Sequence, residues 1–310
     1  MSTLTAICYH YLAREDKFRR IWGHSFSLFK KHLRFLRENY QIIDPQDVLS
    51  ERFKDGKDYM LLTFDDGLKE HVQISDYLNK LGVKGIFAIP TCILRGEPSN
   101  PQIIHFGTAY YGIRKFYNLI VECIRGVFPQ HSNLLVENPE KQELMQVHKA
   151  IKNLFKRQLD QKIGRKVLLN IFEKSLKHDF PDFVKRVYLD KEDIENLVKN
   201  GHSLAVHSDT HPVIKDIEPD EELMRNEVLQ ARDDLSELVG EEVKIFAYPF
   251  GEATDILEDT DYFAKNGYKS ILTTYQRNKN FDLLNLGRYC SQGGDTTNVL
   301  TEKLWKYKIK

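Results

Sequence analysis

The amino-acid sequence predicts an α/β fold built on a parallel sheet, either open or closed into a barrel. Short apolar runs that are typical of buried strands recur along the chain, and amphipathic segments typical of helices lie between most of them. Such alternation is characteristic of parallel sheets. Seven candidate strands are enough to favour closure into a barrel.

Each predicted strand is short, apolar and bounded by turn-forming or charged residues. In chain order the seven strands are Leu4–Tyr11, Tyr59–Phe64, Gly85–Pro90, Ser203–Val206, Val243–Tyr248, Tyr268–Thr273 and Leu284–Cys290. The helices predicted around them mostly end beside a glycine, which is a common helix stop. These helices are Phe26–Tyr40, Leu68–Leu81, Lys191–Asn200, Glu221–Val239 and Ile256–Asn266.

The alternation is interrupted between the third and fourth strands. Residues 94–189 contain no strand pattern, but they contain helical patterns at Ile113–Val127, Lys141–Leu159 and Ile163–Leu176. We therefore expect a single domain over residues 1–310 with a helical insertion at 94–189. Because loops after strands line the active face of such folds, the insertion is either a lid or substrate wall, or a peripheral helical subdomain.

Composition excludes several classes of protein. The 310 residues include 45 basic and 45 acidic side chains, so the zero formal net charge argues against a nucleic-acid partner. The four cysteines form no CxxC pair, which argues against a zinc knuckle or redox motif. The N-terminal segment lacks the features of a signal peptide, and no apolar run is long enough for a membrane span. We therefore expect a cytoplasmic protein; the oligomeric state stays open.

Two adjacent carboxylates end the second predicted strand, in the segment Thr63-Phe64-Asp65-Asp66-Gly67. Burying two carboxylates side by side is costly unless a metal ion or a shared proton offsets the charge. Neighbouring side chains of a strand point to opposite sides, so Asp65 and Asp66 can serve different purposes. An Asp-Gly pair alone would indicate only a turn or a helix cap.

Two histidines follow the fourth predicted strand, at His207 and His211. Histidines four apart can bind one metal ion, although surface pairs at this spacing are common. Both motifs end strands of one parallel sheet, so they should meet at the same edge. One carboxylate and two imidazoles suit Zn²⁺ and also Co²⁺, Ni²⁺ or Mn²⁺. The other carboxylate could deprotonate a metal-bound water, which is the chemistry of amide or ester hydrolysis.

The fifth predicted strand runs into the segment Phe246-Ala247-Tyr248-Pro249-Phe250-Gly251. A turn of this composition fixes the direction of the backbone at a strand end. It either presents a backbone N–H to a developing oxyanion or is an ordinary strand-terminating turn.

These three segments together resemble the polysaccharide deacetylase family, also called the NodB homology domain or carbohydrate esterase family 4. TFDDG at 63–67 and HSDTHP at 207–212 match its first two motifs completely, and FAYPFG at 246–251 is similar to the third. The resemblance runs from about Ile7 to Cys290, apart from the insertion. It implies a distorted (β/α)7 barrel.

The resemblance also implies roles for individual residues. Asp65 would be the catalytic base, and the backbone N–H of Phe250 would stabilise the oxyanion. Ser208 and Thr210 would order the histidine loop. The implied metal ligands are Asp66, His207 and His211. Tyr248 and Arg288 are expected beside the substrate or behind the reacting groups.

The chain departs from the family pattern in three places. Ala247 stands where the third motif often has an arginine that braces the catalytic aspartate. The Asp-Trp pair of the fourth motif is not evident. The fifth motif usually supplies a histidine as general acid, but the segment around Arg288 contains none.

His10, after the first strand, is a candidate for a site role, whereas His105 is expected to be structural or on the surface. Six further histidines are expected on the surface: His24, His32, His71, His131, His148 and His178.

The resemblance implies a hydrolase with a carbohydrate substrate. The leading hypothesis is a metal-dependent enzyme that removes an acetyl group from an N- or O-acetylated sugar, in surface polysaccharide or other glycan biosynthesis. One alternative is a related metal-dependent amidase, such as a sugar deformylase. Another is a glycan-binding homologue with impaired turnover, which the missing arginine and histidine suggest.

Overall fold

Seven parallel strands form the centre of the computed structural model, which describes residues 2–53, 56–275 and 280–310. They are β1 (Thr3–Tyr9), β3 (Asp58–Phe64), β4 (Ile86–Ile89), β5 (Ser203–Val206), β6 (Ile245–Ala247), β7 (Ser270–Thr273) and β8 (Leu286–Cys290). Their spatial order is β1-β8-β7-β6-β5-β4-β3, and pairing between β1 and β3 closes the sheet. The barrel expected from the sequence is therefore confirmed.

A short eighth strand was not predicted. This strand, β2 (Gln41–Ile42), pairs in parallel with Tyr59 and Met60 of β3. Two residues are too few to produce the apolar alternation from which strands are recognised in a sequence.

The interior of the barrel is unusually rich in alanine. Alternate residues of each strand face inward, as the pleat of a β-strand requires. The buried inner cluster includes an alanine from each of β1, β4, β5 and β6, namely Ala6, Ala88, Ala205 and Ala247. Such small side chains leave room inside the barrel for a larger side chain.

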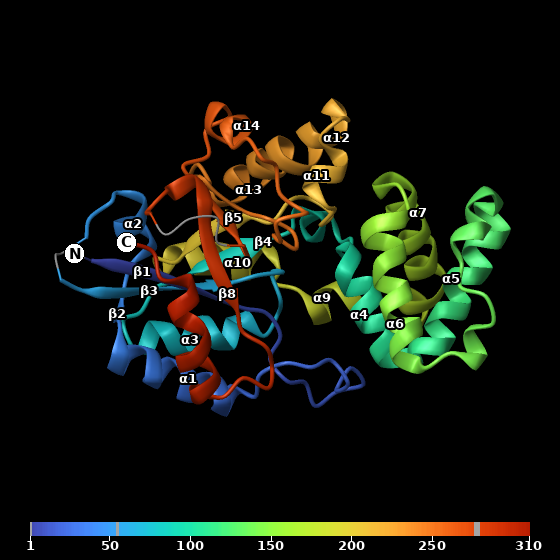
Figure 1. Ribbon diagram of the computed structural model, residues 1–310, viewed down its shortest axis with the longest axis horizontal. Coiled ribbons are helices and arrows are strands. Elements are labelled where there is room, and N and C mark those ends of the chain that lie inside the picture. The colour runs from blue at the N-terminus through green and yellow to red at the C-terminus, as the bar shows by residue number, and fades with distance from the viewer. Residues whose placement is uncertain (1, 54–55, 276–279) are drawn as a thin grey trace.

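Helices cover the outside of the barrel. Figure 1 shows α1 and α3 on one side of the sheet and α13 and α14 on the other. Their bounds, with those of the shorter peripheral helices, are α1 (Phe26–Asn39), α2 (Pro45–Leu49), α3 (His71–Lys80), α10 (Lys191–Lys199), α11 (Ile214–Ile217), α12 (Glu221–Met224), α13 (Ala231–Val239), α14 (Asp261–Lys265) and α15 (Thr297–Leu304).

The predicted helix Ile256–Asn266 is only half correct, since α14 begins at Asp261. The preceding segment is held instead by Asp255, whose buried carboxylate forms ion pairs with Lys156 and Arg157. These partners belong to the insertion, so the local sequence around Asp255 could not reveal them.

The insertion forms a helical group beside the barrel, at the end away from both termini (Figure 1). Its helices are α4 (Asn100–Tyr111), α5 (Ile113–Val127), α6 (Leu144–Asn153), α7 (Gln161–Ile171), α8 (Lys177–Asp179) and α9 (Phe183–Val187). Helix α5 contacts α4, α6 and α7. No helix in the described residues is both long and apolar enough to cross a bilayer.

Replacing Gly107 of α4 by alanine should destabilise the insertion. An added Cβ would fall far inside van der Waals contact with the ring of Phe116 on α5, and such overpacking typically costs about 1–3 kcal/mol. Urea denaturation would measure the loss in free energy of unfolding. Gly126→Ala is the matched control, because a Cβ there meets no atom within 4 Å and should be neutral or stabilising. Equal effects of the two substitutions would contradict close packing of α4 on α5.

Candidate active site

The predicted metal ligands converge at the carboxyl ends of two strands. Asp66 follows β3, and His207 and His211 lie in the loop after β5. Asp66 Oδ1 is 3.6 Å from Nε2 of His207 and 3.7 Å from Nε2 of His211. All three residues are buried, and their ligand atoms lie within 4.8 Å of one another. This donor set suits a divalent transition metal.

The two imidazoles have different surroundings, and within the described chain a hydrogen bond orients only that of His207. His207 donates from Nδ1 to the carbonyl of Ala247 over 2.7 Å, which leaves Nε2 free to face Asp66. Nδ1 of His211 is buried and has no hydrogen-bond partner among the described residues. Burial, together with the nearby His207, lowers the pKa of His211 to about 3. This shift favours the neutral imidazole of His211, the form that metal ligation requires.

Backbone strain is concentrated in the three motif loops, after β3, β5 and β6. Among the described residues, six other than glycine have a positive φ, and four of them lie in the three motif loops. These four are Asp66, Ser208, His211 and Phe250, with φ values of 78°, 57°, 69° and 62°. Such conformations cost free energy for residues with a Cβ, and they cluster where function requires a particular side-chain direction.

Asp65 has a partner that the sequence motifs did not reveal. Arg288 of β8 binds it through two parallel hydrogen bonds, from Nη1 to Oδ1 at 2.7 Å and from Nη2 to Oδ2 at 2.8 Å. Nη1 also donates to Thr63 Oγ1 at 2.9 Å. Arg288 is fully buried inside the barrel. The expectation that Asp65 lacks an arginine partner is therefore wrong, since the guanidinium comes from β8 rather than from position 247.

The ion pair keeps the Asp65 carboxyl ionised. Burial alone would raise the pKa of Asp65, but the Arg288 guanidinium outweighs this and holds it well below its usual range. The pair also explains the small side chain of Ala247, which belongs to the inner cluster of the barrel. One feature of the sequence could have indicated that Arg288 points into the barrel. It lies two residues after Leu286, and this spacing places both side chains on the inward face of β8.

The histidine loop is fixed by a buried carboxylate. Glu227 accepts hydrogen bonds from the backbone N–H groups of Asp209 and Thr210 and from the Thr210 hydroxyl. Ser208 Oγ accepts a hydrogen bond from the N–H of His211 at 3.0 Å. Ser208 and Thr210 thus order this loop as expected, whereas the contribution of Glu227 was not foreseen.

The loop after β6 places an aromatic ring and a free N–H beside the histidines. The Phe250 ring meets the His211 ring edge-on, with centroids 4.7 Å apart. In the part of the chain that the structure describes, no hydrogen-bond acceptor is found for the Phe250 N–H. Tyr248 is buried and lines the cleft described below, which the predicted metal ligands also line. Its hydroxyl accepts a hydrogen bond from the backbone N–H of Leu257.

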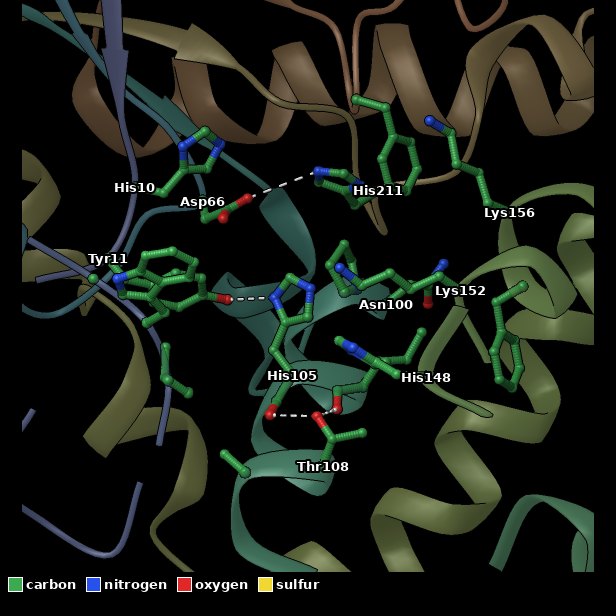
Figure 2. A pocket seen from close by; sticks show the side chains of 18 of the residues that line it. His10, Tyr11, Asp66, Asn100, His105, Thr108, His148, Lys152, Lys156 and His211 are labelled. Carbon is green, nitrogen blue, oxygen red and sulfur yellow. Dashed lines mark hydrogen bonds and ion pairs between the residues drawn. The ribbon is translucent and has the colours of Figure 1, made fainter. Parts of the chain in front are cut away.

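The predicted metal ligands line a cleft of about 1360 Å³ that lies between the barrel and the insertion. Figure 2 shows His10, Asp66 and His211 at one side of this cleft, with His105 and His148 across from them. His148, expected on the surface, is half-buried, and His105, expected to be structural or on the surface, is half-buried and hydrogen-bonded to Tyr11; both line the cleft. The surface expectation is also wrong for three buried histidines, His24, His32 and His71.

Both ends of the insertion are joined to the motif loops by backbone hydrogen bonds. At its start, Asn100 donates to the carbonyl of Thr210 at 3.1 Å. At its end, Leu189 donates to Gly67 at 2.9 Å, and Lys69 donates to Val187 at 2.8 Å.

Comparison with known proteins agrees with the resemblance of the motif segments to polysaccharide deacetylases. The family model for polysaccharide deacetylase matches residues 161–271, which include the histidine loop but not the carboxylate motif. A comparison with curated protein sequences finds no match.

Several solved structures share the fold. Streptococcus pyogenes deacetylase PplD, in complex with acetate, is 16% identical, with a TM-score of 0.58 over 97% of this chain and 98% of that one. IcaB from Ammonifex degensii is 15% identical, with a TM-score of 0.55 over 96% and 95% of the two chains. A de-N-acetylase from Aggregatibacter actinomycetemcomitans is 12% identical, with a TM-score of 0.56 over 97% and 99%.

At these identities the structures establish the fold alone. The matched family model contains the histidine motif, and the complete carboxylate motif lies beside it in space. The chain is thus similar to polysaccharide deacetylases in the matched segment, in its motifs and in its fold.

Proposed function

We propose that this protein is a metal-dependent deacetylase that removes the acetyl group from an N-acetylated sugar in a glycan or glycan precursor. The observation that carries the proposal is that the two adjacent carboxylates have different partners. Asp66 faces the two histidines, while Asp65 is held by Arg288. The likeness to PplD and to a de-N-acetylase supports the same reaction.

Asp66, His207 and His211 would hold the metal ion. When bound, a divalent ion such as Zn²⁺ polarises the acyl carbonyl and lowers the pKa of a water molecule. Asp65, ionised and oriented by Arg288, would accept the proton from the attacking water. The free N–H of Phe250 would donate to the oxyanion that develops on the carbonyl oxygen.

His10 is the residue best placed to protonate the leaving amine. It follows β1, lines the cleft and lies beside Asp66 in Figure 2. It would thus replace the histidine that the fifth motif of the family usually supplies. The retained pair of Asp65 and Arg288 disfavours a glycan-binding homologue without turnover, because binding alone needs no oriented base.

Removal of the metal should abolish hydrolysis. After dialysis against a chelator, the protein should release no acetate from N-acetylated oligosaccharides, and stoichiometric Zn²⁺, Co²⁺, Ni²⁺ or Mn²⁺ should restore activity. Assays for acetate and for formate, run in parallel on acetylated and formylated sugars, would separate a deacetylase from a deformylase. Full activity in metal-free protein would rule out the proposal, and His207→Ala is the control that should not respond to added metal.

A further inference from the structure

One face of helix α6 and of the turn that follows it forms a wall of the cleft. The residues of this face recur at helical spacing and all line the cavity: Leu144, His148, Lys152, Phe155 and Lys156. The wall belongs to the insertion and lies across the cleft from the predicted metal ligands, as Figure 2 shows for His148, Lys152 and His211.

Lys152 is exposed to solvent at the cleft, and no described carboxylate compensates its charge. Lys156, one turn further on, forms ion pairs with Glu252 at 2.9 Å and Asp255 at 3.0 Å. Lys152 forms none within residues 2–53, 56–275 and 280–310. The other carboxylates that line the cleft, Asp65 and Asp66, are engaged by Arg288 and by the two histidines.

His105 adds a hydrogen-bond donor of fixed orientation. Ser99 donates its hydroxyl hydrogen to Oε1 of Gln102, so the amide nitrogen of Gln102 donates to the Tyr11 hydroxyl at 3.2 Å. The Tyr11 hydroxyl lies 2.9 Å from Nδ1 of His105, and because its oxygen already accepts from Gln102, we assign its hydrogen to the bond with that nitrogen. The second nitrogen of His105, Nε2, therefore carries the hydrogen. No acceptor for it is found among the described residues.

Electrostatics keeps these imidazoles neutral. Burial and the charge of Lys152 lower the pKa of His105 to about 4. The same two causes lower the pKa of His148. At neutral pH the group thus offers N–H donors beside one full positive charge, a combination that suits an oxyanion.

We propose that His105, His148 and Lys152 form an oxyanion-binding subsite, which holds a phosphate or carboxylate group carried by the acylated sugar. This proposal rests on the proposed function, and it defines the substrate class as an anionic rather than a neutral sugar. It also assigns the insertion its role as a substrate wall. A bound oxyanion would supply the counter-charge that Lys152 lacks and the acceptor that His105 Nε2 lacks.

Binding of three small probes tests the subsite without relying on turnover. The 310-residue protein with Asp65→Asn would be titrated calorimetrically with N-acetylglucosamine, N-acetylglucosamine 1-phosphate and N-acetylmuramic acid. We expect at least one anionic probe to bind about tenfold more tightly than the neutral sugar, the gain typical of one charge-assisted hydrogen bond. The preferred anionic probe distinguishes a phosphate from a carboxylate ligand.

Substitutions test which side chains cause the preference for an anionic probe over the neutral sugar. Lys152→Gln should remove the advantage of the anionic probe and leave binding of N-acetylglucosamine unchanged. Lys149→Gln is the matched control, because Lys149 is exposed on the same helix and is not part of the cleft lining. His148→Gln should weaken anion binding in the same sense as Lys152→Gln.

Two results would overturn the subsite: equal binding of neutral and anionic probes, or an anion preference that survives Lys152→Gln. Failure of the proposed function would look different. If the metal-loaded wild-type protein released acetate from no sugar, yet the anion preference and its loss in Lys152→Gln persisted, the subsite would stand and the deacetylase assignment would fall.

Discussion

The Asp65→Asn variant should hydrolyse acetylated sugars at least about 100 times more slowly than the wild-type protein, because an amide cannot accept a proton as a general base does. Metal binding should be unaffected, since Asp65 faces Arg288 and not the histidines. Asparagine has nearly the same shape as aspartate, so the loss would be chemical. Steady-state rates and the metal content of the purified protein would measure the two effects separately.

Asp66→Asn is the matched comparison at the neighbouring position. It should lose both metal and activity, since Asp66 is the carboxylate that faces His207 and His211. If Asp65→Asn keeps its turnover, or if it loses metal as Asp66→Asn does, the two carboxylates have been assigned the wrong roles.

Arg288→Met should be both less stable and less active than the wild-type protein. The substitution leaves the Asp65 carboxylate buried without its partner, and breaking a buried pair in this way costs about 3–5 kcal/mol. Urea denaturation at several pH values would measure the loss. The acid limb of the rate profile should also move to higher pH, because burial without Arg288 raises the pKa of Asp65.

The sign of the pH dependence follows from the two pKa values. In the wild-type protein the pKa of Asp65 is lower when folded than when unfolded. The pair therefore stabilises the fold above a pH of about 3.9, and this stabilisation is lost as the pH falls toward the folded pKa. In Arg288→Met the order is reversed, so ionisation of Asp65 opposes folding. The stability difference between the two proteins should widen from pH 3 to pH 7.

Two further variants separate charge from geometry. Arg288→Lys keeps the charge but cannot form the paired hydrogen bonds, so it should restore stability only in part. The double variant Ala247→Arg with Arg288→Ala moves the guanidinium to the position that the family motif favours, and it should recover more activity than Arg288→Ala alone. Unchanged stability in Arg288→Met would show that the pair is not the reason Asp65 tolerates burial.

The residues that could be predicted from the sequence are those whose signal is local. Asp65, Asp66, His207 and His211 each stand within a few residues of a recognisable strand end, and parallel topology then brings them to one edge of the barrel. Arg288 could not be paired with Asp65 in the same way. Its contact depends on closure of the barrel through β1, which lies between β8 and β3 in space.

Long-range packing also sets the position of His105 in the cleft, which the local sequence does not reveal. Its environment is set by Tyr11, which lies 94 residues away in the sequence. Nothing near position 105 reveals that the insertion turns back over the barrel. The histidines that were expected on the surface but are buried show the same effect, since a histidine among charged residues can still face inward on a helix.

The backbone hydrogen bonds at the two ends of the insertion tie it to the motif loops. They join Asn100 to Thr210 and Leu189 to Gly67, so the insertion begins and ends on the loops that carry the metal ligands. A hinge at these junctions would break the contacts that hold the histidine and carboxylate loops. Trimming the insertion would therefore remove backbone partners from both motif loops, and it should lower the local stability of those loops.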